Sequence, residues 1–178
     1  MRFTATSLAG ATIVDMDKLE DQRGFFARAF CQREFDSLGM SGEIVQANVS
    51  YTVTRGTVRG LHYQIEPAVE TKLLRCTRGA IIDVIVDMRT ESPTYREHMS
   101  VELTADNHRA LFVPAMCAHG FQTLEDHTEV MYLVSGFHTP TCERGLRYDD
   151  PALNIHWPLD VTQISDKDAG WPLLQVDE

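Results

Sequence analysis

The sequence predicts an all-β domain, a β-sandwich or barrel with a few short helices. Three observations support this prediction: short β-rich segments, frequent turn residues between them, and little helical periodicity. In Ile81–Met88 the aliphatic side chains at every second position share one face of a strand, and Asp83 and Asp87 lie on the other face. Alternation with a period of two residues is typical of a β-strand.

The first helix is expected at Gln32–Leu38, where Gly39 supplies a C-terminal stop. Another helical turn or two is expected at residues 161–169. We find no internal repeat, low-complexity tract or linker, and 178 residues are within the usual size of one domain. The sequence therefore predicts a single domain over residues 1–178.

Further strands are expected at Arg109–Pro114 and Thr128–Ser135, which are rich in β-forming residues. One more, Leu73–Thr77, is joined by Arg78-Gly79, a pair suited to a tight turn, to Ala80–Met88, which contains the strand described above. This spacing predicts that the two strands form a β-hairpin.

Composition limits the partners. The formal net charge of −10 repels nucleic acid and anionic membranes on average, although arginines can still gather around a small anionic substrate. No apolar run approaches the roughly 20 residues that span a bilayer, and the N-terminus shows no secretion signal. No cysteine pair has the C-x-x-C spacing of a zinc site, so we expect reduced, mostly buried thiols in a cytoplasmic protein: Cys31, Cys76, Cys117 and Cys142.

Alternation places two polar side chains on faces expected to point inward. His62 shares a strand face with Gly60, which leaves space beside the imidazole for a small ligand. Lys72 shares a face with Leu74 and Cys76, and a buried lysine is costly unless it is paired. Each has a structural alternative, a hydrogen-bonded core histidine or a lysine whose ammonium reaches solvent from the strand start.

Tyr132 shares a face with Val130 and Val134, and on its own it is typical of an ordinary core tyrosine. His119 is expected in a turn before a strand, as either a site residue or a structural one. Nucleotide-binding loops, the serine-hydrolase G-x-S-x-G motif and the H-E-x-x-H motif are absent. Four arginines stand beside glycines and either converge on a phosphate or are plain turn residues: Arg23, Arg55, Arg59 and Arg144.

Nine short segments form a pattern when they are taken together: Asp21–Phe26, Val45–Asn48, Arg59–Gln64, Lys72–Arg75, Asp83-Val84 with Asp87, Ser92–Thr94, Val113-Pro114, Ala118–Phe121 and Ser165–Ala169. In this order and spacing they resemble the dTDP-4-dehydrorhamnose 3,5-epimerase family, from about Asp21 to Leu174. The resemblance implies a cupin-type β-jelly-roll that epimerises a nucleotide-linked 4-keto-6-deoxy sugar at C3, C5 or both. It also implies no cofactor, no metal, and a homodimer with exchanged N-terminal strands.

The same resemblance implies roles for matching residues. His62 corresponds to the catalytic base and Asp168 to its carboxylate partner. Lys72 corresponds to the residue that stabilises the enolate oxygen, and Tyr132 to the proton donor on the opposite face. Contacts to the nucleotide, diphosphate or sugar are implied for a further set: Arg23, Gln46, Asn48, Arg59, His119, Glu143 and Lys167.

Two positions depart from the family pattern. Arg28 stands where relatives typically have a glutamate, and His138 stands where relatives often have a second tyrosine. We expect both residues at the substrate, where they change its contacts. The number of carbons that are epimerised therefore stays open.

The implied chemistry is coherent. A proton next to a C4 ketone is acidic because the resulting enolate spreads its charge onto oxygen. A neutral imidazole is a suitable base near pH 7, and an aspartate fixes its tautomer. A lysine supplies a cation for the developing oxyanion, and inversion needs two proton carriers on opposite walls.

Two other functions stay open. A metal-dependent cupin oxygenase or isomerase would use His62 and His119 with a carboxylate. Such cupins usually show H-x-H followed by a glutamate, whereas Tyr63 and Gln64 follow His62 here. The other alternative is a non-enzymatic sugar-binding protein of the same fold. Bound metal would identify the first alternative, and a lack of deuterium exchange the second.

Overall fold

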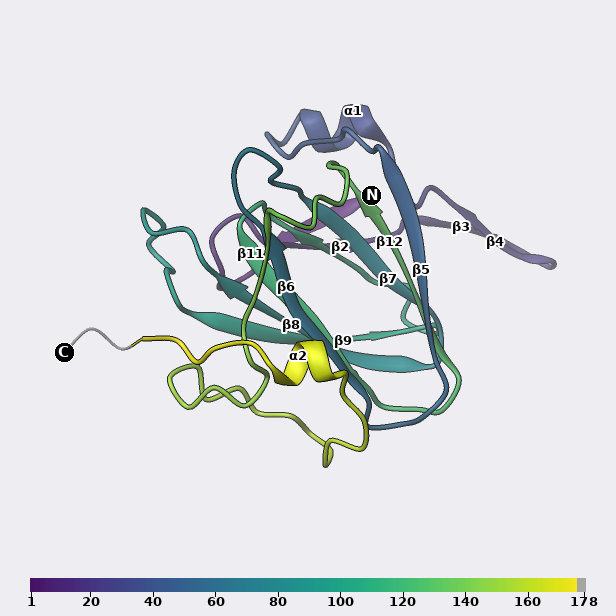
Figure 1. Ribbon diagram of the computed structural model, residues 1–178. Coiled ribbons are helices and arrows are strands. Elements are labelled where there is room, and N and C mark those ends of the chain that lie inside the picture. Colours follow the sequence, from purple (N-terminus) through teal and green to yellow (C-terminus); the bar gives the residue numbers. More distant parts are fainter. Residues whose placement is uncertain (176–178) are drawn as a thin grey trace.

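Two antiparallel β-sheets packed face to face form the body of the computed structural model, which describes residues 1–175 (Figure 1). The six-stranded sheet has the order β1-β2-β10-β7-β12-β5, with bounds Arg2–Ala5, Thr12–Asp15, Ala110–Val113, Lys72–Arg78, Thr128–Val134 and Gln46–Thr52. The five-stranded sheet has the order β13-β6-β11-β8-β9, with bounds Glu143–Gly145, Val58–Gln64, Cys117–Thr123, Ala80–Asp87 and His98–Thr104. The predicted all-β sandwich is therefore confirmed.

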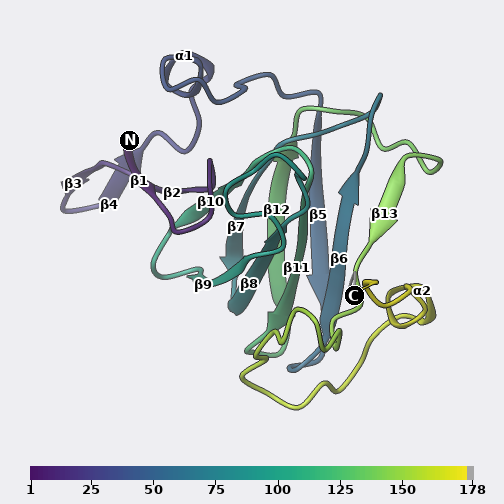
Figure 2. The same ribbon diagram turned by 90° about the vertical axis from the view of Figure 1, so that its left-hand side faces the viewer.

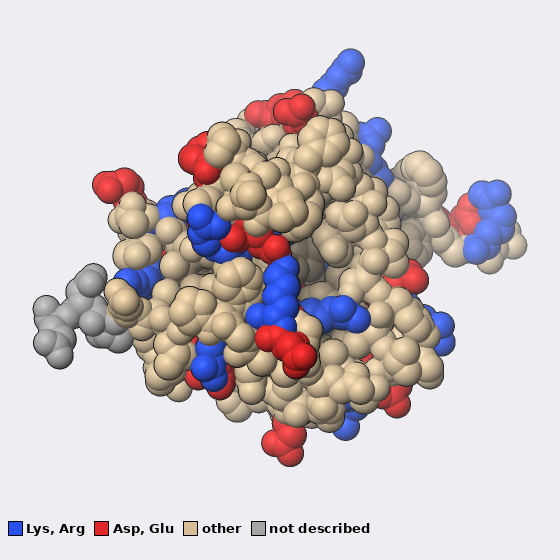
Figure 3. Space-filling view, in the orientation of Figure 1, with Lys and Arg blue, Asp and Glu red and all other residues tan. Residues whose placement is uncertain are grey.

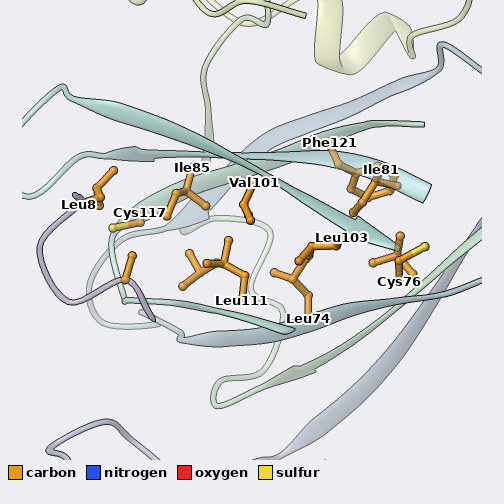
Figure 4. Packing of buried hydrophobic residues seen from close by; sticks show 13 residues of the cluster. Leu8, Leu74, Cys76, Ile81, Ile85, Val101, Leu103, Leu111, Cys117 and Phe121 are labelled. Carbon is orange, nitrogen blue, oxygen red and sulfur yellow. The ribbon is translucent and has the colours of Figure 1, made fainter. Parts of the chain in front are cut away.

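The main hydrophobic core lies between the two sheets (Figure 4). Leu74 of β7 and Leu111 of β10 come from the six-stranded sheet, and Ile85 of β8 and Leu103 of β9 come from the five-stranded sheet. All four side chains are fully buried. Replacing one such leucine by alanine typically costs about 2–5 kcal/mol, so this layer fixes how the sheets sit against each other.

Smaller elements cover the outer faces of the sandwich. Helix α1 (Gln32–Asp36) packs its buried Phe35 on the six-stranded sheet, and Gly39 follows it with a φ of 72°. The predicted helix at this place is confirmed, although it ends two residues earlier than expected. Helix α2 (Asp166–Ala169) lies beside β6 and β13, as Figure 2 shows, and confirms the second predicted helical turn.

The predicted hairpin around Arg78-Gly79 is wrong. Strand β7 pairs with β10 and β12, whereas β8 pairs with β9 and β11, so both edges of each strand are occupied by other partners. Gly79 has a φ of 74°, and a Cβ there would lie 2.5 Å from Thr128 Oγ1. The two residues therefore form a corner that carries the chain from one sheet to the other.

A hairpin of β3 (Lys18–Asp21) and β4 (Gly24–Ala27) projects away from the body (Figure 1). Its apolar side chains are exposed, at 69% for Leu19 and 74% for Phe26. Within residues 1–175, no helix is both long and apolar enough to cross a membrane.

Candidate active site

One end of the sandwich interior is open and polar instead of filled. A cavity of about 1020 Å³ lies there, and it is lined from both sheets. His62 and His119 come from the five-stranded sheet, and Lys72 and Tyr132 come from the six-stranded sheet. An adjoining cavity of about 590 Å³ shares His62, Lys72 and Tyr132 with it. The face in Figure 3 is hollowed near its centre, where basic and acidic side chains border the opening.

Strand alternation explains how Lys72 and Tyr132 reach the cavity. Leu74 and Cys76 share the inner face of β7 with Lys72 and are fully buried in the core. Tyr132 follows the buried Val130 on the inner face of β12. Because the core fills only part of the interior, the next inward position on each strand faces the cavity. The predicted inward orientation of both residues is confirmed.

His62 is hydrogen-bonded to a carboxylate brought from the C-terminal segment. Ser165 caps α2 by accepting from the Asp168 backbone N–H at 3.1 Å, which fixes the first turn of the helix. Asp168 Oδ1 lies 2.7 Å from His62 Nε2, and its Oδ2 accepts from the Gly60 backbone N–H at 3.0 Å. Burial raises the pKa of Asp168, but these hydrogen bonds outweigh it and hold the pKa below its usual value. The carboxylate is therefore ionised, and it leaves His62 Nδ1 free.

Gly60 and His62 both line the larger cavity, so the expected space beside the imidazole is present, but the missing Cβ of Gly60 does not create it. A Cβ at Gly60 would lie 2.6 Å from Gly120 Cα and 2.7 Å from the His119 carbonyl oxygen. The missing side chain admits the backbone of β11 rather than a ligand. Gly60 therefore serves the site by letting β6 and β11 approach closely, with its N–H turned to Asp168.

His119 lies inside β11, so the predicted turn at this residue is wrong. Its Cα pairs in register with that of His62, and its Nε2 lies 2.7 Å from Asp83 Oδ1. Asp83 is fully buried. Burial raises the pKa of its carboxyl group, whereas the charge of His119 acts to lower it. The site thus holds two histidine–aspartate pairs side by side. Sequence reasoning missed the Asp83 contact, although an acidic residue in an apolar strand was a signal for it.

Lys72 is almost buried and contacts one carbonyl oxygen and one carboxylate. Its Nζ donates to the His62 carbonyl oxygen at 3.1 Å and lies 3.4 Å from Glu70 Oε1. Sequence reasoning also missed Glu70, which lies two residues before the start of β7 at Lys72. Burial raises the pKa of Tyr132, and the charge of Glu70 adds to the rise, so the phenol keeps its proton at neutral pH.

The residues expected at the substrate divide into two groups. Arg59 lines the larger cavity, and its Nε donates to Thr52 Oγ1 at 2.9 Å. Five others line the adjoining cavity: Gln46, Asn48, His138, Glu143 and Lys167. Within this second set Lys167 Nζ lies 2.7 Å from Glu143 Oε1, and Gln46 Oε1 accepts from the His138 backbone N–H at 3.0 Å.

Arg23 and Arg28 do not line either cavity in the single chain. Arg23 lies in the β3–β4 turn and pairs with Asp21, and Arg28 lies just beyond β4 and contacts Glu34 at 2.8 Å. Both side chains are exposed on or next to the projecting hairpin. Their expected contact with the substrate therefore cannot form within one chain in this arrangement.

The family model for dTDP-4-dehydrorhamnose 3,5-epimerase matches residues 5–176. The chain belongs to this family. It is 43% identical over 175 residues to the dTDP-4-dehydrorhamnose 3,5-epimerase of Sinorhizobium fredii, which covers 98% of this chain and 90% of the relative. It is 34% identical over 175 residues to the dTDP-4-dehydrorhamnose 3-epimerase of Streptomyces niveus, covering 98% and 84%.

A solved structure of the dTDP-4-dehydrorhamnose 3,5-epimerase family agrees closely with the present one. The enzyme from Bacillus anthracis, with TDP and PPi bound, has a TM-score of 0.93 and 42% sequence identity. The alignment covers 97% of this chain and 99% of that one. The fold is therefore the cupin-type β-jelly-roll implied by the sequence, in a family of isomerase-class enzymes.

Proposed function

We propose that the protein epimerises C3, C5 or both in a dTDP-linked 4-keto-6-deoxy sugar through an enolate. One observation carries the proposal. His62, which is paired with Asp168, and Tyr132 come from opposite sheets and border the same cavity. Lys72 lines both this cavity and the adjoining one. A base and an acid on opposite walls are what inversion at carbon needs. Family membership supports the same reaction.

His62 is the proposed base. Its Nε2 donates to the ionised Asp168, which fixes the tautomer whose Nδ1 carries a lone pair toward the substrate. When Nδ1 takes the proton next to the ketone, the imidazole becomes a cation, and the carboxylate at 2.7 Å stabilises it. The electron pair left on carbon passes into the ketone to form the enolate.

Lys72 and Tyr132 are proposed to complete the reaction. The Lys72 ammonium stabilises the negative charge that develops on the former ketone oxygen. Tyr132 then delivers its phenolic proton to the opposite face of the carbon, and the ketone re-forms with inverted configuration. The raised pKa of Tyr132 supports this role because an acid must still hold its proton when the enolate forms.

The dTDP moiety is proposed to lie along the cavities beyond the sugar. The related enzyme from Bacillus anthracis holds TDP and PPi, and the matching chain here offers the cations Arg59 and Lys167. Gln46, Asn48, His119 and Glu143 supply neutral or anionic hydrogen-bond partners for the sugar and the base. His138 borders the same space and is proposed to contact the substrate as well.

We also infer that the protein is a homodimer. The projecting hairpin exposes Phe25 and Phe26, and edge strand β5 exposes Val49 and Tyr51, which together offer apolar surface for a second copy. A hairpin laid on the partner would carry Arg23 and Arg28 to the partner's cavity. A single domain over 1–178 and a cytoplasmic location remain part of this proposal, and the free cysteines support the latter.

Proton NMR of a dTDP-4-keto-6-deoxyhexose in deuterium oxide tests the function. We expect deuterium to enter at C3, C5 or both, with formation of the inverted sugar, and exchange at one carbon alone would define a mono-epimerase. No exchange with any such sugar would refute the proposal. Incubation with EDTA serves as the control for a metal-dependent reaction, and we expect activity to survive it. Loss of activity that one metal restores would overturn the lysine-based mechanism.

A further inference from the structure

The carboxylate of Glu70 lies inside the site beside the proposed enolate-stabilising cation. The Glu70 and Lys72 side chains are 12% and 10% exposed, and Oε1 lies 3.4 Å from Nζ. Glu70 also lines the smaller cavity together with Lys72 and Tyr132. A carboxylate in a cavity meant for a diphosphate sugar is unfavourable for binding, so its presence calls for a separate function.

The contacts of the ammonium supply that function. A lysine Nζ has three N–H donors and no acceptor. One donor goes to the His62 carbonyl oxygen at 3.1 Å, and the Glu70 carboxylate forms an ion pair with the ammonium, with Oε1 at 3.4 Å from Nζ. We infer that Glu70 is a positioning residue that, with this carbonyl, holds Lys72 so that another N–H points at the substrate's C4 oxygen. This inference rests on the proposed function, because it assigns an oxygen to that donor.

Of the groups whose charge is felt near Lys72, Glu70 is the one placed to orient the ammonium. Asp83 on β8 feels the ammonium charge; its Oδ1 is bonded to His119 and its buried Oδ2 has no hydrogen-bond partner within residues 1–175, but the ion pair of Lys72 is with Glu70. Cys117 on β11 also feels that charge, and burial raises the pKa of its thiol to about 12, so it is neutral.

Other titratable groups face the same space. His62 faces Lys72 from β6 and Tyr132 faces it from β12, while a third group lines the smaller cavity: His138, Glu143 and Lys167. Among residues 1–175, Glu70 is the carboxylate within ion-pair distance of Lys72.

Two substitutions separate the orienting effect from the charge. Glu70→Ala removes the ion pair, and we expect kcat to fall about 10- to 100-fold with KM changed far less, because the ammonium is no longer held in place. Glu70→Gln keeps a neutral side chain of the same shape and should recover part of kcat. Glu66→Gln, an exposed change in the same loop, is the matched control.

A second measurement does not depend on activity. The chain has three lysines, Lys18, Lys72 and Lys167, so labelling with [13Cε]lysine gives few NMR signals. The Lys72 signal is assigned by its loss in Lys72→Met. In Glu70→Gln we expect the chemical shift of the Lys72 signal to differ from its wild-type value, because the ion pair with Glu70 is lost, while the Lys18 signal stays in place.

The outcomes separate the two proposals. An unchanged Lys72 chemical shift in Glu70→Gln, or wild-type kcat in Glu70→Ala, would overturn the positioning role even if the enzyme epimerises its sugar. If the wild type exchanges no proton while Glu70→Gln still moves the Lys72 signal, the proposed function fails and the Glu70–Lys72 pairing stands.

Discussion

Asp168→Asn tests the proposed base most sharply, because it replaces two acceptors with one acceptor and one donor. In the native protein both carboxylate oxygens are used, by His62 Nε2 at 2.7 Å and by the Gly60 N–H at 3.0 Å. Asparagine satisfies both neighbours only with its oxygen toward Gly60 and its NH₂ toward His62. Nε2 must then accept, so the imidazole proton moves to Nδ1 and blocks the nitrogen that takes the substrate's proton.

The size of the effect follows from the same contacts. Keeping the active tautomer would leave the Gly60 N–H buried without an acceptor, which costs about 1–3 kcal/mol. Losing the negative charge removes a charge-assisted hydrogen bond to the imidazolium, worth about 1.5–3 kcal/mol. Because each 1.4 kcal/mol is about a factor of ten, kcat should fall roughly 10²- to 10⁴-fold. The corresponding change in a serine protease triad costs about 10⁴-fold.

The assay is deuterium exchange and product formation by proton NMR near pH 7, with circular dichroism to establish the folded fraction. Asp150→Asn is the matched control: Asp150 is also buried and accepts from the backbone N–H groups of Ala152 and Leu174, outside both cavities. We expect this control to lose stability but to keep its kcat. An Asp168→Asn protein that turns over within about threefold of the wild type would refute the tautomer argument.

Three further predictions follow from the site. His62→Ala should abolish both solvent exchange and epimerisation, whereas Tyr132→Phe should keep residual exchange with little inverted product; epimerisation by Tyr132→Phe at near wild-type rates would remove its role. Lys72→Met should lower kcat about 10²- to 10³-fold, and an unchanged kcat would exclude Lys72 from enolate stabilisation. Because the folded-state pKa of Asp168 lies below 3.8, its ionisation stabilises the fold above about pH 4, and that contribution is lost as the pH falls through the folded value. Urea unfolding should therefore show a stability gap between wild type and Asp168→Asn at pH 6 that narrows at pH 3, and a constant gap would contradict the shift.

Strand positions were predictable from short runs of β-forming residues with a period of two, even though β8 is buried on both faces. The segments Ile81–Met88 and Thr128–Ser135 correspond to β8 and β12 within about a residue at each end. Strand pairing was not predictable in the same way. A glycine with positive φ, such as Gly79, suits both a hairpin and a corner between sheets, and the free edges of the neighbouring strands decide between them.

The site was predictable in part from local pattern. Alternation alone oriented Lys72 and Tyr132, because each shares a strand face with buried neighbours. The pairing of His62 with Asp168 joins residues 106 positions apart, so only the family resemblance pointed to it. Glu70 was overlooked because an acidic residue next to a loop is usually solvated, and only the three-dimensional structure shows its contact with Lys72.

The location of the proposed acid and base on different sheets has a consequence for how the family can vary. Stacked sheets lie about 10 Å apart, and this spacing is maintained by core side chains such as Leu74, Ile85 and Leu103, which do not line either cavity. The distance between His62 and Tyr132, and so the space for a sugar ring, therefore depends on core packing as well as on the residues that line the cavity. We expect substitutions that change the volume of a core side chain to alter this distance and the stability together.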